Sequence, residues 1–282
     1  MPSAERTAYP RFSRSLTAQE WSRFFTSTEE ELALARAEAR GERHQLCFVT
    51  LLKCFQRLHY FPALDQVPSA VVEHIREQAK IPKETLLEYE QPKTFYRHCR
   101  SIRESLGIHA YYGKQAHHTA VAAAYQAAQV MDQQSDVINS VIDELIEQHF
   151  ELPAYSALQQ IAERVNTVVQ RRLFQKVLGR LTPQQTEALD HLLVVEFDHR
   201  QSAFDLLKKL PQRPSRTHLE ELLDHLDWLD SMGDVAAPLE GVPATKIRSF
   251  ASRTKALDAS DLRDFTPARR YTMPYGQNTR TA

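Results

Sequence analysis

Apolar residues recur three and four positions apart along most of this chain, and no other feature of the sequence constrains the fold as strongly. The clearest stripes are Phe95, Cys99, Ile102 and Leu106; Ile138, Val141, Ile142, Leu145 and Ile146; and Leu219, Leu222, Leu223, Leu226 and Leu229. This spacing places each set on one face of a helix, and such a face needs a core to cover it. Only 7 glycines are present, too few for many tight hairpins. The sequence therefore predicts an all-α fold, a multi-helix array of small subdomains with no sheet.

The expected helices can be bounded from capping residues and from breaks in the pattern. Thr17 to Glu20 and Thr28 to Glu31 form capping boxes, and Gly107 follows a helix-like run as C-terminal caps do. The predicted helices span 18–25, 28–40, 44–58, 69–80, 83–90, 92–106, 116–133, 136–150, 155–178, 183–195, 199–210, 216–232 and 243–257.

Glycine and proline breaks divide the 282 residues into three predicted parts. Residues 1–110 are expected to form a first helical subdomain and residues 111–235 a second. Residues 236–282 are expected to be a linker leading toward a further region. Within them, the polar residues 273–282 are typical of an unstructured tail.

The sequence carries no pattern typical of a catalytic or metal site. Gly107 to Gln115 superficially resembles a phosphate loop, but no strand precedes it and no Ser or Thr follows the lysine. A zinc site built from His44, Cys47, Cys54 and His59 is disfavoured, because these residues lack the close ligand pairs of structural zinc sites. We therefore expect no bound metal and no cofactor.

No targeting or membrane-spanning segment is recognisable in the sequence. The N-terminal residues lack the apolar core of a secretory signal, and no apolar stretch approaches the roughly 20 residues needed to cross a bilayer. The 3 cysteines, without a CxxC pair, fit a reducing compartment. A cytoplasmic location without a membrane partner is expected.

Charge is distributed in blocks, although the formal net charge is only −1. Residues 131–165 hold seven acidic residues and one arginine, whereas 243–282 hold eight Lys or Arg and three Asp. Residues 91–118 hold five Lys or Arg and a single acidic residue.

The predicted helix 92–106 lies in this basic block, with its apolar stripe on one side. The other side carries Lys93, Tyr96, Arg97, Arg100 and Arg103. Such a face suits DNA, because arginine binds guanine edges and phosphates and a helix fits the major groove; an ordinary solvated helix is the alternative.

The order of several short motifs resembles the Tn3 family of replicative transposases. The first part of this resemblance lies in Gln45–Leu58, Phe61-Pro62, Val67-Pro68, Tyr96-Arg97-His98, Ile102-Arg103 and Leu106-Gly107. It continues through Glu151–Leu158, Leu178–Pro183, Leu210-Pro211, Arg213–Ser215, Leu222-Leu223, Leu226–Leu229, Ala259–Leu262 and Arg269–Tyr271. The resemblance covers roughly residues 16–271 and ends after Tyr271.

The resemblance implies helical, helix-turn-helix-like DNA-binding subdomains that recognise the transposon's terminal inverted repeats. In such transposases a separate domain cuts DNA with three carboxylates and magnesium, and those carboxylates have no counterpart here. We therefore expect a truncated transposase that is not itself an enzyme, binds double-stranded DNA and associates with the nucleoid when bound.

The residues expected to contact DNA come from three basic clusters. The first is the helix face of Lys93, Tyr96, Arg97, Arg100 and Arg103; the second is Lys208, Lys209, Arg213 and Arg216; the third is Arg40 and Arg43. An alternative hypothesis is an interaction module, in which the acidic block and the leucine stripe bind a second copy or the intact transposase. An independent enzyme is the least favoured reading, because no catalytic constellation is present.

Overall fold

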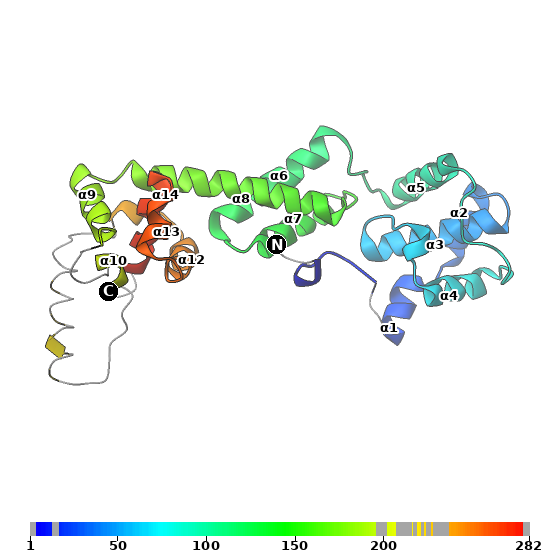
Figure 1. The fold of residues 1–282 in the computed structure, drawn as a ribbon. Coiled ribbons are helices and arrows are strands. Elements are labelled where there is room, and N and C mark those ends of the chain that lie inside the picture. The colour runs from blue at the N-terminus through cyan, green and yellow to red at the C-terminus, as the bar shows by residue number, and fades with distance from the viewer. Residues whose placement is uncertain are drawn as a thin grey trace. The chain divides into compact units, whose positions relative to one another are not determined.

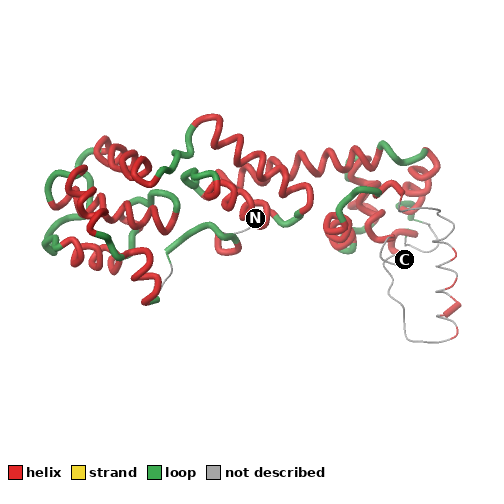
Figure 2. The backbone as a smooth tube through the Cα atoms, turned by 180° about the vertical axis from the view of Figure 1, so that it is seen from behind, coloured by secondary structure: helices red, strands yellow, loops and turns green. Residues whose placement is uncertain are grey.

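The computed structural model describes residues 4–12, 17–195, 202–206 and 237–278, together with positions 216, 219, 220, 223 and 227. Along these residues the regular elements are helices, and extended segments pair only at two isolated bridges, His109 with Phe150 and Val195 with Ser202 (Figure 2). The predicted all-α fold is confirmed. Figure 1 shows the helices of two compact units. The N-terminal unit comprises 1–124 and 135–161, and the C-terminal unit comprises 125–134 and 162–282.

The first half of the N-terminal unit is built from short helices around one long one. Its elements are η1 (Ala4–Arg6), α1 (Ala18–Glu20), η2 (Trp21–Phe25), α2 (Glu29–Glu38), α3 (Glu42–Leu58), η3 (Leu64–Gln66), α4 (Ser69–Ala79) and α5 (Pro92–Leu106). Both predicted capping boxes form, since the Thr17 and Thr28 hydroxyls accept hydrogen bonds from the backbone N–H groups of Glu20 and Glu31. These caps satisfy donors that a first helical turn leaves unpaired.

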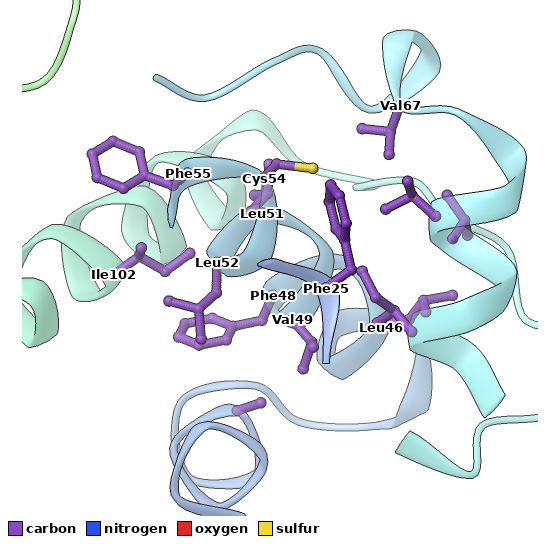
Figure 3. Packing of buried hydrophobic residues seen from close by; sticks show 14 of the residues in the cluster. Phe25, Leu46, Phe48, Val49, Leu51, Leu52, Cys54, Phe55, Val67 and Ile102 are labelled. Carbon is purple, nitrogen blue, oxygen red and sulfur yellow. The ribbon is translucent and has the colours of Figure 1, made fainter. Parts of the chain in front are cut away.

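Helix α3 lies at the centre of this first half of the unit, with buried side chains around most of its circumference, and Figure 3 shows part of this packing. Phe48 and Leu51 of α3 are fully buried, as are Phe25 of η2, Ile75 of α4 and Ile102 of α5, which belong to the same cluster. Burial of one such side chain stabilises a fold by roughly 1.5–3 kcal/mol. The cluster therefore fixes the helices that surround α3, including α5.

A buried ion pair joins α2 to α3. Lys53 Nζ lies 3.0 and 2.9 Å from the two carboxylate oxygens of Glu31, and the Gln56 amide donates to the same carboxylate at 2.7 Å. Burial alone would raise the pKa of Glu31, but hydrogen bonds from Thr28, Gln56 and Lys53 hold this pKa below its usual value. The carboxylate is therefore charged and fully engaged at neutral pH.

Longer helices follow in the second half of the N-terminal unit. These are α6 (Gly113–Val130) up to residue 124, α7 (Gln134–Glu147) from residue 135, and the first turns of α8 (Tyr155–Leu178). The predicted stripe of α7 is largely buried, with Ile138, Val141 and Leu145 at 0% exposure. The His109 N–H donates to the His149 carbonyl at 2.7 Å, which ties the segment after α5 to the segment after α7.

The C-terminal unit packs short helices against the later turns of α8. Its elements are α9 (Pro183–Leu192), α10 (Ala203–Leu206), η4 (Ala237–Leu239), α12 (Ala244–Thr254), α13 (Ala259–Arg263) and α14 (Pro267–Asn278). Their core contains Val177, Phe204, Phe250, Leu262 and Met273.

A nearly buried carboxylate binds α12 in the same unit. Asp132 accepts hydrogen bonds from Lys246 Nζ, Ser249 and Arg253 of α12.

The predicted helix over 83–90 is wrong, because this segment is a turn followed by extended chain. Side chains from neighbouring helices bind backbone carbonyls in and just before this segment: Arg76 donates to Pro82 and Thr85 at 2.7 and 2.8 Å, and Arg43 donates to Glu88 at 3.1 Å. Carbonyls satisfied in this way do not need helical partners.

Two expectations about the end of the chain also fail where the structure describes it. Leu219 and Leu223 are 56% and 51% exposed, so these two residues do not face a core; Leu222, Leu226 and Leu229 lie outside the described residues. Residues 273–278, expected to be an unstructured tail, belong to α14. Met273 is 2% exposed and its carbonyl accepts from the Thr254 hydroxyl at 3.1 Å. Packing against α12 therefore stabilises a helix that the polar sequence does not indicate.

Candidate nucleic-acid interface

Helix α5 has the bounds that the sequence predicts, and both ends have a local cause. Gln91 is extended and Pro92 occupies the first helical position, where its missing N–H removes no helical hydrogen bond. Gly107 closes the helix at φ 66°, a left-handed conformation that glycine adopts without steric cost. The helix therefore presents a fixed set of side chains between residues 92 and 106.

The inner face of α5 packs on the α3 core. Cys99 and Ile102 are 3% and 0% exposed, and Phe95 and Leu106 pack against the same cluster. This contact fixes the rotation of the helix about its axis. The outer face is consequently determined as well.

The outer face of α5 carries four of the five side chains that the sequence predicts for it. Lys93, Arg97 and Arg100 are exposed, and Tyr96 is 68% exposed. Arg100 donates to Glu104 at 2.8 Å, but both side chains are well exposed. An exposed pair of this kind contributes little to stability, because solvent screens it, so Arg100 can exchange its carboxylate for another anion at little cost.

His98 is a buried residue of α5 that ties the helix to the segment before it. Its ring is fully buried, and its Nδ1 lies 2.7 Å from the Tyr89 hydroxyl in the segment that precedes the helix. Burial, followed by the nearby charges of Arg97 and His44, lowers the pKa of His98 to about 4. The imidazole is therefore neutral at physiological pH, and the positive charge of the helix comes from lysine and arginine.

Arg103 turns away from the outer face. Its guanidinium donates to Glu151 at 3.0 Å and lies 5.5 Å from the centre of the Phe61 ring. Only about a fifth of each charged side chain is exposed. Burial raises the pKa of Glu151, an effect that the charge of Arg103 opposes. This arrangement favours a structural role for Arg103.

In the third predicted cluster, one arginine binds carboxylates of the protein and the other is exposed. Arg43 hydrogen-bonds to the carboxylates of Glu88 and Glu90, the latter at 2.7 Å. It therefore holds the extended segment against α3. Arg40 is exposed, and its side chain has no ion-pair partner among the residues that the structure describes. Of this pair, Arg40 is the one available for an external ligand.

The second predicted cluster falls mostly outside the described residues. Lys208, Lys209 and Arg213 are not described. Arg216 is 93% exposed in its side chain and pairs with Glu220 at 3.1 Å. Its contact with DNA remains a prediction.

Neither a metal site nor a membrane span appears in the parts of the chain with a described structure. No group of three His, Cys, Asp or Glu side chains is arranged to hold a metal ion there. Likewise, none of the described helices is both long and apolar enough to cross a membrane. The three cysteines are all buried as free thiols.

Known proteins match this chain over most of its length. Residues 1–165 match the family described as "Domain of unknown function (DUF4158)". The transposase for transposon Tn3926 of Escherichia coli is 25% identical over 256 residues, which is 88% of this chain and 25% of that protein. The transposases for Tn501 of Pseudomonas aeruginosa and Tn1546 of Enterococcus faecium are 22% and 20% identical, over 88% and 89% of this chain. The chain spans about a quarter of the length of these relatives.

Proposed function

This chain belongs to the DUF4158 family and to the Tn3-family transposases, and on that basis we propose that it binds the terminal inverted repeats of a transposon in a sequence-specific way. The observation that carries this proposal is the outer face of α5. This face combines exposed Lys93, Tyr96, Arg97 and Arg100 on a helix whose inner face is buried.

The dimensions of this face suit a DNA groove. Lys93 and Arg100 are seven residues apart, or roughly 10 Å along a helix that rises 1.5 Å per residue. The major groove of B-form DNA is about 12 Å wide and admits one helix. Lys93, Tyr96, Arg97 and Arg100 follow a 3, 1, 3 spacing, so all four would face the same groove.

The four side chains can make different kinds of contact with DNA. Arg97 has no carboxylate partner among the described residues, and its Nη2 lies 3.5 Å from Nε2 of the neighbouring His98. Its charge is therefore not neutralised within the described chain, and its guanidinium can fork onto guanine or onto phosphate. Arg100 can exchange Glu104 for a phosphate, and Lys93 adds a further cation at the start of the helix. The Tyr96 hydroxyl can donate to a phosphate oxygen. None of these contacts requires a metal, so we propose cofactor-free binding that survives chelation by EDTA.

Selection followed by titration tests the proposal. Duplexes that bind the purified chain are recovered from a random pool, sequenced and compared with the repeated ends of the element that encodes it. Fluorescence anisotropy then compares the selected duplex with a scrambled duplex of the same composition. We expect tighter binding to the selected duplex and binding that weakens as salt rises, because phosphate contacts release counterions.

Single substitutions test the site within the same assay. Arg97→Ala and Arg100→Ala should each weaken binding by about 1–3 kcal/mol if the arginine reads a base. Arg36→Ala is the matched control, because Arg36 is an exposed helical arginine of α2 in the same unit. Unchanged affinity in both α5 variants would refute the assignment, and equal affinity for selected and scrambled duplexes would refute sequence specificity.

An interaction module is the second candidate function, favoured by the exposure of Leu219 and Leu223. Exposed leucines four residues apart can form an apolar contact with a second copy or with the intact transposase. Light scattering of the chain with and without DNA separates the candidates. A dimer that forms without DNA and dissociates on Leu223→Glu substitution would support the interaction module.

A further inference from the structure

The later turns of α8 carry a second exposed basic face, in the C-terminal unit. Between residues 162 and 178 the helix holds Arg164, Arg171, Arg172 and Lys176, and its single acidic residue there is Glu163. Its opposite side is apolar and buried, with Ala162, Val165, Val169 and Val177 between 0% and 8% exposed. The helix is therefore fixed by one side and free on the other.

The residues of the free side are exposed, spaced for one helical face and polar except for Val168. They are Arg164, Thr167, Val168, Arg171 and Gln175, at intervals of three, one, three and four residues. Val168 is 44% exposed, so an apolar side chain stands in the middle of a polar face. This face covers roughly 16 Å of helix between residues 164 and 175.

The two arginines of this face are unengaged, unlike their neighbours. Arg172 donates to the Tyr125 hydroxyl at 2.9 Å and lies over the Tyr125 ring, and Arg180 binds the carbonyls of Pro238 and Glu240. Arg164 and Arg171 have no such partner within the described part of the chain. Two guanidinium groups without a partner in the described chain give this face a positive charge, and Glu163, at its edge, is the one acidic residue of α8 between 162 and 178.

We propose that this face of α8 is a second DNA-contacting surface, which binds a segment of the major groove distinct from the segment that α5 binds. Arg164 and Arg171 supply contacts to guanine or phosphate. Gln175 matches the edge of adenine, and Thr167 and Val168 offer methyl groups to the methyl of thymine. The occupant is therefore duplex DNA, with base readout as well as phosphate binding. This inference rests on the proposed function and extends it to the C-terminal unit.

The occupant is argued from charge and side-chain type together. A helical protein partner would be matched by an apolar stripe, but Val168 is the one apolar residue on this face. An RNA duplex presents a major groove too deep and narrow for such a helix. Arginine, glutamine and threonine at helical spacing instead have partners on the edges of DNA bases.

Footprinting on the selected duplex tests the inference in the full chain. Hydroxyl-radical cleavage of the wild-type complex should show two protected segments. The double variant Arg164→Ala/Arg171→Ala should lose one segment and bind at least about tenfold more weakly, with a salt dependence reduced by about one to two contacts. The double variant Arg97→Ala/Arg100→Ala should lose the other segment. Arg248→Ala, an exposed arginine of α12 in the same unit, should leave both segments protected.

The outcomes separate this inference from the proposed function. Wild-type affinity and both segments in Arg164→Ala/Arg171→Ala would overturn the second surface while leaving the α5 proposal intact. Failure of the wild-type chain to prefer its selected duplex would overturn the proposed function and the second surface together. A circular dichroism melt shows whether each variant is folded, and substitution of exposed residues should leave the melting temperature unchanged. Gln175→Ala gives an independent reading, since the base preference at one selected position should relax if Gln175 reads adenine and should persist if it does not.

Discussion

Replacing Arg103 with alanine should destabilise the N-terminal unit rather than remove a DNA contact. Arg103 and Glu151 lie 3.0 Å apart with 21% and 19% of their side chains exposed. Removing one partner of a fully buried pair costs about 3–5 kcal/mol, because a charge is left buried and unpaired. The residual exposure reduces this to about 2 kcal/mol, and loss of the cation–π contact with Phe61 adds about 0.5 kcal/mol. The expected loss in the free energy of unfolding is therefore about 2–3 kcal/mol at pH 7.

The loss in the free energy of unfolding caused by Arg103→Ala should depend on pH, and the burial of Glu151 determines the direction. Burial already raises the pKa of Glu151, and the charge of Arg103 opposes this shift. Without Arg103 the folded-state pKa rises further, so the folded state binds a proton that the unfolded state releases. Stability then falls as pH rises between the unfolded and the folded pKa. The Arg103→Ala variant should consequently be closer to wild type at pH 4 than at pH 7.

Urea unfolding of the full chain, followed by circular dichroism, measures the effect by linear extrapolation. Arg100→Ala is the control, since its pair with Glu104 is exposed and contributes little to the free energy of unfolding. Glu151→Gln and the double variant complete a cycle that isolates the interaction of the pair. A loss below about 0.5 kcal/mol for Arg103→Ala, combined with weaker DNA binding, would show that Arg103 faces DNA instead.

Three further substitutions test interactions within each unit. Lys53→Met should cost about 3 kcal/mol in urea unfolding, because Glu31 keeps its charge in a site that loses its cation; an unchanged midpoint would contradict the buried pair. Gly107→Ala should cost about 1 kcal/mol from the left-handed backbone alone, since a Cβ there would meet no atom within 4 Å; a higher melting temperature would show that the residue is not left-handed in solution. Asp132→Ala should lower the melting temperature of the C-terminal unit, because Lys246, 1% exposed in its side chain, would lose its counter-ion; limited proteolysis within α12 would report the same loss, and resistance equal to wild type would argue against it.

The fold could be predicted from the sequence wherever local signals and packing agree. Helices α5 and α8 have the predicted bounds of 92–106 and 155–178. At α5 an apolar stripe, Pro92 at the first position and Gly107 at the end coincide. The segment 83–90 is not a helix, since Arg43 and Arg76 supply hydrogen bonds that no local pattern reveals. The three predicted parts of the chain remain a prediction about independent folding. The compact units change over within α6, at the start of α7 and within α8.

In the candidate site, too, local spacing was predictive and long-range contacts were not. The apolar stripe Phe95, Cys99, Ile102 and Leu106 determines which side of α5 is covered, so four of the five outer residues followed from spacing alone. Arg103 borders that stripe, and its partner Glu151 lies 48 residues further along the chain. Charge composition likewise did not separate Arg97, which has no carboxylate partner among the described residues, from Arg103 and Arg43, which bind glutamates. The sequence did not predict the α8 face, because Arg164 lies at the end of the acidic block 131–165, although Val165 and Val169 mark the opposite side of that helix.

Site-specific photocrosslinking tests most directly whether the outer face of α5 lies against DNA. The photoreactive amino acid benzoylphenylalanine is placed at Tyr96, and in a control protein at the exposed Leu86 in the extended segment before the helix. Irradiation with the selected duplex should crosslink DNA from position 96, and an excess of unlabelled selected duplex should suppress this crosslink more than scrambled duplex does. Crosslinking from position 86 but not from position 96, or suppression by both duplexes alike, would contradict sequence-specific binding through α5.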